Sequence, residues 1–227
     1  MAAWPGDQRC PRVVFVSLGR FIAFEGGEGT GKSTQARLLA DWLGERDIPS
    51  ILTREPGGTP GAEAIRSLLL HPPGEGWGAR AEALLFAASR SDHVERLIRP
   101  SLGAGTWVVC DRFLDSSRAY QGAAGALGDA LVRSLHDLGS EGMLPDLTIV
   151  IDVPGEVIAQ RLQERDGDTS DAIGGRSASY HARVNSAFRD FAAEEPGRFV
   201  VIDGNAAPDQ VQARVRQAIM PLLEQAR

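Results

Sequence analysis

The stretch GGEGTGKST, residues 26–34, has the residue types and spacing of a loop that binds phosphate. It fits the pattern G-x-x-x-x-G-K-[ST], follows the apolar run FIAF, and precedes a segment with helical periodicity. Glycines in such a loop let backbone N–H groups turn inward around polyphosphate oxygens, and the helix N-terminus adds partial positive charge. A glycine-rich turn with an incidental lysine is the alternative, but every fixed position and both flanking elements agree with the motif. The predicted nucleotide-binding residues are Gly26, Gly27, Glu28, Gly29, Thr30, Gly31, Lys32, Ser33 and Thr34.

A second polar pair, Asp111 and Arg112, could complete a phosphate-transfer site with Lys32 and Ser33 of the loop. Lys32 is expected to reach the terminal phosphates of a nucleotide, and the Ser33 hydroxyl is expected to ligate Mg²⁺. Further along, the apolar run Trp107–Cys110 ends in Asp111 and Arg112. A carboxylate at the carboxyl end of a central strand, where open α/β sheets bind ligands, suits Mg²⁺ or its bound waters. A structural salt bridge between Asp111 and Arg112 is the alternative interpretation.

A phosphate-binding loop alone does not choose among a switch GTPase, a motor ATPase and a small-molecule kinase. A motor ATPase would more naturally carry a second acid after Asp111, whereas this chain has Arg112, which suits a second phosphate group. A switch GTPase should show an N-K-x-D guanine-binding motif, and the sequence contains none. The pattern therefore favours a kinase.

Composition excludes several other classes. The 227 residues carry a formal net charge of −6 without a long block of lysine and arginine, so we expect no nucleic-acid polymer as partner. Cys10 and Cys110 cannot form a disulfide framework, and Cys110 ends an apolar run, which favours a reducing cytoplasm. No apolar stretch approaches the roughly 20 residues of a membrane span. Residues 1–20 lack a signal-peptide cleavage pattern and are interpreted as an N-terminal arm.

Alternating elements predict an α/β fold. Apolar runs rich in β-branched residues read as buried strands at 21–24, 51–53, 107–110, 147–153 and 199–202. Segments with helical periodicity lie between and after them, at 33–43, 62–70, 79–102, 127–138, 156–165, 179–193 and 209–225. We predict a three-layer fold, a five-stranded parallel sheet with helices on both faces, in one domain over residues 21–227. A polar, glycine-flanked stretch at about 166–176 is expected to form a mobile lid.

Five segments together resemble the bacterial thymidylate kinase family of P-loop nucleoside monophosphate kinases. They are the phosphate-binding loop, TREPGGT at 53–59, LLFAASRSDHV at 84–94, DRFLDSSRAYQG at 111–122 and PDLTIVIDV at 145–153. The two segments TREPGGT and DRFLDSSRAYQG are far more specific than the loop, and they occur in the family's order. The resemblance runs from about residue 21 to the C-terminus. It implies transfer of a phosphoryl group from ATP to dTMP, giving ADP and dTDP, with Mg²⁺, in a homodimer.

The resemblance also assigns the acceptor site. Phe86 and Arg90 are four residues apart, so on a helix they share a face and could stack a pyrimidine and bond its carbonyl edge. Without the resemblance, a buried Phe beside a solvated Arg would be the more common interpretation. Arg54, before a rigid Glu-Pro-Gly-Gly turn, and Arg112 could together clamp the acceptor phosphate; an ordinary surface arginine is the alternative interpretation of Arg54. The resemblance implies that Tyr120 packs against the sugar of the acceptor nucleotide.

Further residues match family positions with smaller roles. Gln121 matches the side chain whose amide reads a pyrimidine edge, and Ser117 matches a Ser or Thr near the base, although short polar residues are more often helix caps. Glu28 is expected to meet the acceptor's sugar hydroxyl or a metal-bound water. Glu25, just before the loop, is a candidate for the Mg²⁺ shell.

The lid departs from the family pattern. The bacterial branch places a catalytic arginine in the lid, but the expected position holds Ala172. We therefore expect Arg165, with Arg161 or Arg176, to close over the phosphates, and Arg161 also resembles the adenine-stacking residue. A solvated arginine at a helix end is the alternative for each. As catalytic residues we predict Lys32, Asp111, Arg112, Arg165 and Glu28.

Two other functions compete with this one. A related nucleotide or nucleoside kinase would share the donor site, but two arginines at the acceptor site favour an acceptor that already carries a phosphate. A non-catalytic nucleotide-binding module belongs to a different class. Retention of Lys32, Ser33 and Asp111 counts against it.

Overall fold

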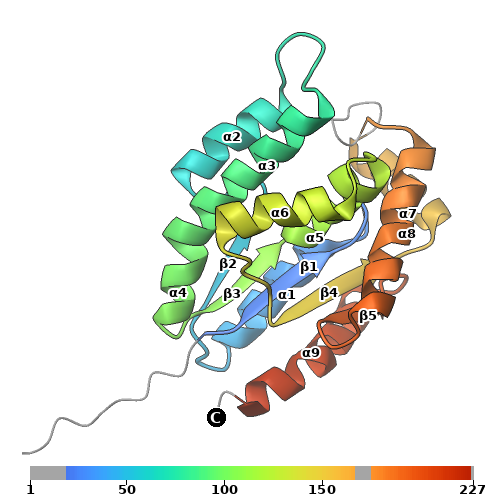
Figure 1. Ribbon diagram of the computed structural model, residues 1–227. Coiled ribbons are helices and arrows are strands. Elements are labelled where there is room, and N and C mark those ends of the chain that lie inside the picture. Colours follow the sequence, from blue (N-terminus) through green and yellow to red (C-terminus); the bar gives the residue numbers. More distant parts are fainter. Residues whose placement is uncertain (1–18, 167–174, 226–227) are drawn as a thin grey trace, which may run out of the picture.

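The central element is a five-stranded sheet in which all neighbouring strands run parallel, in the order β2-β3-β1-β4-β5. The computed structural model describes residues 19–166 and 175–225, and Figure 1 traces the chain. The strands are β1 (Phe21–Glu25), β2 (Ser50–Arg54), β3 (Trp107–Asp111), β4 (Leu147–Asp152) and β5 (Phe199–Asp203). All five predicted strands are thus confirmed, and no strand end is shifted by more than one residue.

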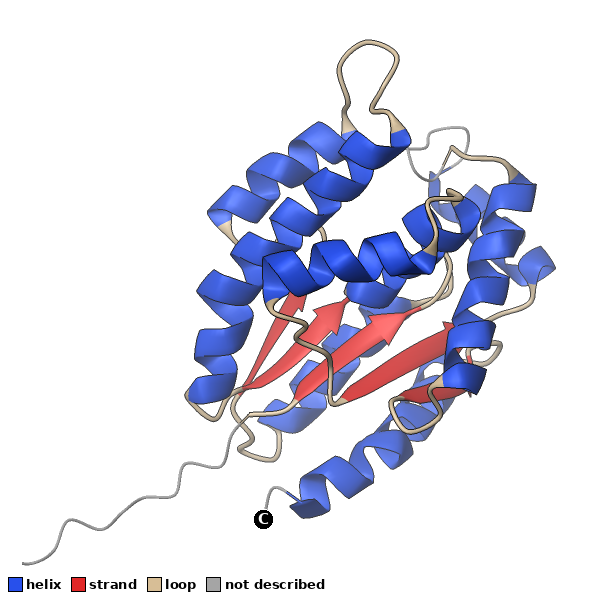
Figure 2. Cartoon of the chain, viewed as in Figure 1, coloured by secondary structure: helices blue, strands red, loops and turns tan. Residues whose placement is uncertain are grey.

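Helices cover both faces of this sheet, as Figure 2 shows. The predicted three-layer α/β fold is confirmed. The helices are α1 (Lys32–Gly44), α2 (Pro60–Leu70), α3 (Ala79–His93), η1 (Val94–Ile98), α4 (Arg99–Gly103), α5 (Leu114–Ser117), η2 (Arg118–Ala124), α6 (Asp129–Ser140), α7 (Gly155–Asp166), α8 (Ala178–Glu194) and α9 (Pro208–Gln225).

The strand sequences explain why both faces are covered. Successive side chains of a strand point to opposite faces, so an entirely apolar strand must be buried on both. In β1, Ile22 and Phe24 pack into one core with α1 and α9. Phe21 and Ala23 pack on the opposite face against η1, α5 and α6. This burial fixes the sheet and leaves its carboxyl edge for polar residues.

Two helical regions differ from the sequence expectation. The predicted helix over 79–102 is continuous but contains the π-helical turn η1 at Val94–Ile98. The segment DRFLDSSRAYQG, which lacks a helical apolar period, forms α5 and η2. Hydrogen bonds from a distant part of the chain hold this segment. The Glu25 carboxylate accepts hydrogen bonds from the backbone N–H groups of Phe113 and Ser116 at the start of α5. Such long-range partners leave no local pattern in the sequence.

Three expectations fall on residues outside those the structure describes. The N-terminal arm is described only from residue 19, and the lid only at residues 166, 175 and 176, without the side chain of Asp166. The side chain of Arg165 also lies outside the described part, although its backbone belongs to α7. Among the described helices, none has the length and apolar character that crossing a membrane requires.

Candidate active site

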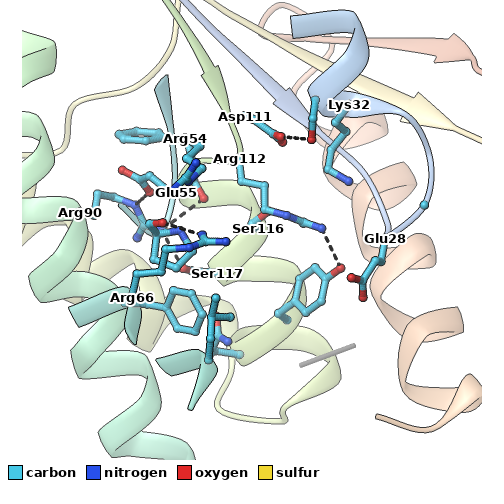
Figure 3. A pocket seen from close by; sticks show the side chains of 18 of the residues that line it. Glu28, Lys32, Arg54, Glu55, Arg66, Arg90, Asp111, Arg112, Ser116 and Ser117 are labelled. Atoms are coloured by element: carbon cyan, nitrogen blue, oxygen red, sulfur yellow. Dashed lines mark hydrogen bonds and ion pairs between the residues drawn. The ribbon is translucent and has the colours of Figure 1, made fainter. Parts of the chain in front are cut away.

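A cavity of about 540 Å³ opens at the carboxyl edge of the sheet, where β1, β2 and β3 end. Figure 3 shows Lys32 and Glu28 on one side of it, Glu55 and Arg90 on the other, and Arg112 between them. This edge includes the place where the chain order along the sheet reverses, the usual ligand position in an open α/β sheet. The predicted residues that line the cavity are Glu28, Gly29, Gly31, Lys32, Ser33, Thr34, Arg54, Phe86, Arg90, Asp111, Arg112, Ser117, Tyr120, Gln121 and Arg161.

The loop between β1 and α1 has the backbone shape that its glycines permit. Gly26 has φ 135°, and a Cβ added there would lie 2.6 Å from the Ile151 carbonyl oxygen. Gly31 caps α1 with φ 97°. Both angles lie in the region that L side chains rarely adopt, so glycine is needed at each. Gly26, Gly27 and Thr30 are not among the cavity-lining residues and instead support the loop.

Lys32 folds back over this loop. Its Nζ donates to the Gly27 carbonyl and lies 3.4 Å from the Thr30 hydroxyl oxygen, which itself donates to Gly27. Burial lowers the pKa of Lys32 from 10.5 to about 7, and the neighbouring Arg112 guanidinium acts in the same direction. An anion placed in the loop would favour the charged ammonium. The loop therefore holds a lysine whose charge depends on a bound anion.

Asp111 and Ser33 meet beside the loop. The Ser33 hydroxyl donates to Asp111 Oδ2, whereas Asp111 Oδ1 is buried and has no hydrogen-bond partner among the described residues. A hydroxyl and a carboxylate with one unused oxygen are a donor set that suits Mg²⁺. In the described part of the chain, no three His, Cys, Asp or Glu side chains are grouped closely enough to hold a metal ion. A bound ion would therefore need phosphate or water ligands as well.

Glu25 is fully buried and makes a different set of contacts. Its Oε1 accepts from the backbone N–H of Phe113 and Ser116, and its Oε2 accepts from the Ser116 hydroxyl at 2.6 Å. Burial raises the pKa of Glu25 to about 7, and the Asp115 carboxylate adds to the rise. Glu25 does not line the cavity. The structure thus shows it anchoring the turn after β3, and its place in an Mg²⁺ shell stays a prediction.

Arg112 occupies the centre of the site. Its backbone is left-handed with φ 71°, a conformation that costs a non-glycine residue free energy. Its guanidinium donates to the Ser116 hydroxyl at 3.0 Å and lies 5.1 Å from the centre of the Tyr120 ring. It also donates to the Tyr120 hydroxyl at 3.4 Å. This backbone turns the side chain from the end of β3 into the cavity.

On the far side, Arg90 is held rigidly. It is 3% exposed, and its Nε donates to Glu55 Oε2 at 2.7 Å. Its Nη2 donates to the Ser117 hydroxyl at 2.7 Å and to the Phe113 carbonyl. Its Nη1 makes no hydrogen bond with the described residues. Ser117 thus contacts Arg90 directly, and one guanidinium nitrogen remains for a ligand.

Glu55 is a site residue that the sequence reasoning missed. It is 5% exposed, and besides Arg90 it contacts His93 Nδ1 at 3.1 Å. His93 Nε2 in turn shares a hydrogen bond with the Thr53 hydroxyl. The only available signal was its place inside the REPGGT motif. Its carboxylate fixes the direction of the Arg90 fork.

The part of the cavity wall that contains Arg54 is more exposed to solvent. The Arg54 side chain is 54% exposed and donates to both carboxylate oxygens of Glu63, at 3.0 and 3.2 Å. Arg66 also lines the cavity and donates to the Pro56 carbonyl at 2.8 Å. The sequence reasoning missed Arg66, although its spacing of four from Leu70, another lining residue, places both on one helix face. Two arginines from β2 and α2 thus border the cavity.

Three arginines are expected to close over the phosphates, and the structure describes the side chains of two of them, Arg161 and Arg176. Arg161 lines the cavity and donates to the Thr30 carbonyl at 3.4 Å and the Gly204 carbonyl at 3.2 Å. Arg176 does not line it and pairs with Glu82 on α3. The sequence did not predict this second arrangement, because Glu82 is far away in the chain.

Comparisons with known proteins agree on one family. The family model described as thymidylate kinase matches residues 24–215. A curated thymidylate kinase from Rhizorhabdus wittichii is 54% identical over 205 residues, which cover 90% of this chain and 99% of the relative. Another, from Rhodopseudomonas palustris, is 51% identical and covers 92% of each chain. The crystal structure of thymidylate kinase from Ehrlichia chaffeensis superposes with a TM-score of 0.73 at 33% identity, covering 89% of this chain and 99% of that one.

Proposed function

Because the chain belongs to the thymidylate kinase family, we propose that it transfers the terminal phosphoryl group of ATP to dTMP, giving ADP and dTDP. One observation carries the residue assignment. A single cavity joins a phosphate-binding loop at one end to an aromatic side chain and a fixed arginine, Phe86 and Arg90, at the other. Arg112 lies between the two ends, where the transferred group must pass (Figure 3).

The donor site is the loop with Lys32, Ser33 and Thr34. Backbone N–H groups and the start of α1 receive the ATP phosphates, and Lys32 neutralises the terminal ones. Ser33 and Asp111 would hold Mg²⁺, whose charge offsets that of the phosphates. Arg161, which contacts the Thr30 carbonyl of the loop, would stack on adenine.

The acceptor site is the opposite end of the cavity. Phe86 stacks on the thymine ring, and the unused Nη1 of Arg90 donates to a thymine carbonyl. Arg54 and Arg112 bind the acceptor phosphate. Glu28 reaches the sugar hydroxyl, with Tyr120 packed against the sugar.

Catalysis is then mainly positioning and charge neutralisation, because in-line phosphoryl transfer needs no strong general base. Arg112 lies where charge develops on the transferred group. Arg165, whose backbone belongs to α7, would add a further positive charge to those of Lys32 and Arg112. Each such contact is worth on the order of 3 to 5 kcal/mol in the transition state.

The test is ADP production with a panel of acceptors: dTMP, dUMP, dCMP, dAMP, dGMP and thymidine. We expect dTMP to give the highest kcat/KM and thymidine to give none above background. The Lys32→Ala protein, prepared in parallel, reports any contaminating kinase. A better acceptor than dTMP would refute the assignment of the acceptor site while leaving the donor site intact.

We also propose a homodimer in the cytoplasm. Helices α2, α3 and α6 lie side by side on one flank of the molecule (Figure 1). Large exposed apolar side chains occur on all three: Leu68, Leu84, Leu131 and Leu138, the last 85% exposed. Exposed apolar groups over neighbouring helices favour burial against a second copy.

Light scattering during gel filtration tests the dimer. Leu84→Glu with Leu138→Glu should give the monomer mass where the wild type gives twice that mass. Met220→Glu, an equally apolar exposed position on α9, is the control and should leave the dimer intact. A monomeric wild type would refute the proposal.

A further inference from the structure

Glu82 lies next to the proposed base-reading residue Gln121. It comes from the first turn of α3, and its side chain is 14% exposed. Its Oε1 accepts a hydrogen bond of 2.8 Å from Gln121 Nε2. Gln121 is 3% exposed and lines the cavity, and among the described residues nothing donates to its Oε1. The amide nitrogen of Gln121 is therefore engaged by Glu82, and its oxygen is available to a ligand in the cavity.

The other oxygen of Glu82 is occupied as well. Its Oε2 accepts from Arg176 Nη2 at 2.5 Å. Arg176 also donates to the hydroxyl of Tyr180, which donates in turn to the Tyr120 carbonyl at 2.6 Å. This closed set of bonds joins α3 and α8 to the backbone turn that carries Gln121. Glu82 is thus held in one position by Gln121 and Arg176.

We propose that Glu82 is a specificity-determining residue that fixes the amide orientation of Gln121, so that the cavity accepts a pyrimidine with an N3–H donor and rejects one with an N3 acceptor. The inference rests on the proposed reading of the base by Gln121. Its physical basis is an asymmetry of side chains, because a glutamine amide can turn either end toward a ligand, whereas a carboxylate can only accept. Next to Glu82, only one of the two amide orientations forms a hydrogen bond.

The consequence for the ligand follows from the two base edges. Thymine presents an N3–H donor between two carbonyls, and Gln121 Oε1 can accept from it. Cytosine presents N3 as an acceptor, which would face the same oxygen without a hydrogen bond between them. Sites built for one hydrogen-bond polarity discriminate strongly, because the wrong ligand leaves buried polar groups unpaired.

The test compares two acceptors that share the 5-methyl group, dTMP and 5-methyl-dCMP. The ratio of their kcat/KM values is measured at pH 8 for the wild type and for Glu82→Gln. With an amide at position 82, Gln121 can turn over, so we expect the ratio to fall at least about tenfold. The change should arise in KM, with kcat for dTMP within about threefold of the wild type.

Arg176→Gln is the matched control, because it breaks the same ion pair and leaves the carboxylate of Glu82 in place. Its ratio should stay within about threefold of the wild type. Equal losses of selectivity in both variants would mean that the ion pair acts only structurally and would overturn the proposal. So would a Glu82→Gln ratio within twofold of the wild type.

A polarity swap keeps the proposal testable should Glu82→Gln fold poorly. In Glu82→Gln/Gln121→Glu, the amide at position 82 donates to a carboxylate at position 121, which can again only accept from the base. Selectivity for dTMP should return, and its absence in a folded double variant would contradict the proposal. A wild type that does not prefer dTMP would instead refute the base-reading role of Gln121.

Discussion

The Ser33 hydroxyl donates a hydrogen bond to Asp111 Oδ2, which joins the first turn of α1 to the end of β3 across 78 positions of sequence. The second carboxylate oxygen, Oδ1, is buried without a hydrogen-bond partner among the described residues. A buried polar atom left unpaired costs on the order of 1 to 3 kcal/mol, so such an atom at a ligand site indicates a missing partner. Ser33 and Asp111 thus provide a hydroxyl and a carboxylate oxygen that could ligate a cation.

Asp111→Asn should raise the Mg²⁺ concentration needed for half-maximal activity and lower kcat at least a hundredfold, because the amide carries no charge and offers one oxygen instead of two. A magnesium titration of ADP production measures both. Asp203→Asn is the control, since Asp203 also ends a strand but lies outside the cavity. An unchanged magnesium dependence in Asp111→Asn would exclude Asp111 as a ligand.

Lys32→Ala should lower kcat by a few orders of magnitude, because it removes charge that stabilises the transition state. The melting temperature should stay within a few degrees, because burying this ammonium costs the fold free energy. Arg37→Ala removes an exposed cation from the same helix and should keep full activity. A Lys32→Ala protein with more than a tenth of wild-type turnover contradicts the assignment.

The protonation of Lys32 should depend on bound nucleotide. Its pKa is about 7 in the free protein, so at pH 8 most molecules carry the neutral amine. Phosphate anions favour the ammonium and raise this pKa, so ATP binding should take up protons at pH 8 and weaken as pH rises above 7. Calorimetry in buffers of different ionisation enthalpy measures the uptake.

The same pKa can be read directly, because Lys32 is the single lysine of the 227 residues. After ¹³C-methylation, its NMR signal should titrate near pH 7 without ligand and shift upward with ATP. A midpoint near 10.5 in the free protein would show that the lysine is solvated.

Arg118→Met should destabilise the protein by about 3 kcal/mol. Arg118 is 1% exposed and pairs with the buried Asp115 and with the more exposed Asp129 and Glu195, so its loss leaves the buried Asp115 carboxylate with one arginine partner instead of two. Chemical denaturation measures the change. Arg96→Met, which removes an arginine 68% exposed from a surface pair, should cost less than about 1 kcal/mol. Equal costs would mean that the buried network contributes nothing specific.

The sequence by itself determined the fold class and predicted the donor site. Five short runs of β-branched and apolar residues predicted strands covered on both faces, because a strand that is apolar on both sides leaves apolar surface in water unless both faces are covered. The phosphate-binding loop is local: its glycines, lysine and serine act through backbone shape and a helix N-terminus within nine residues. Family motifs added Phe86, Arg90 and Arg112, all of which line the cavity.

Only the tertiary structure decided how the side chains of the proposed acceptor site are held. Glu55 fixes Arg90 from 35 positions away, and Glu82 fixes Gln121 from 39 positions away. These bonds form when β2, α3 and η2 meet around the end of the sheet. No periodicity or spacing in the sequence predicts which carboxylate will bind which amide or guanidinium, because these pairs depend on how elements distant in the chain pack together.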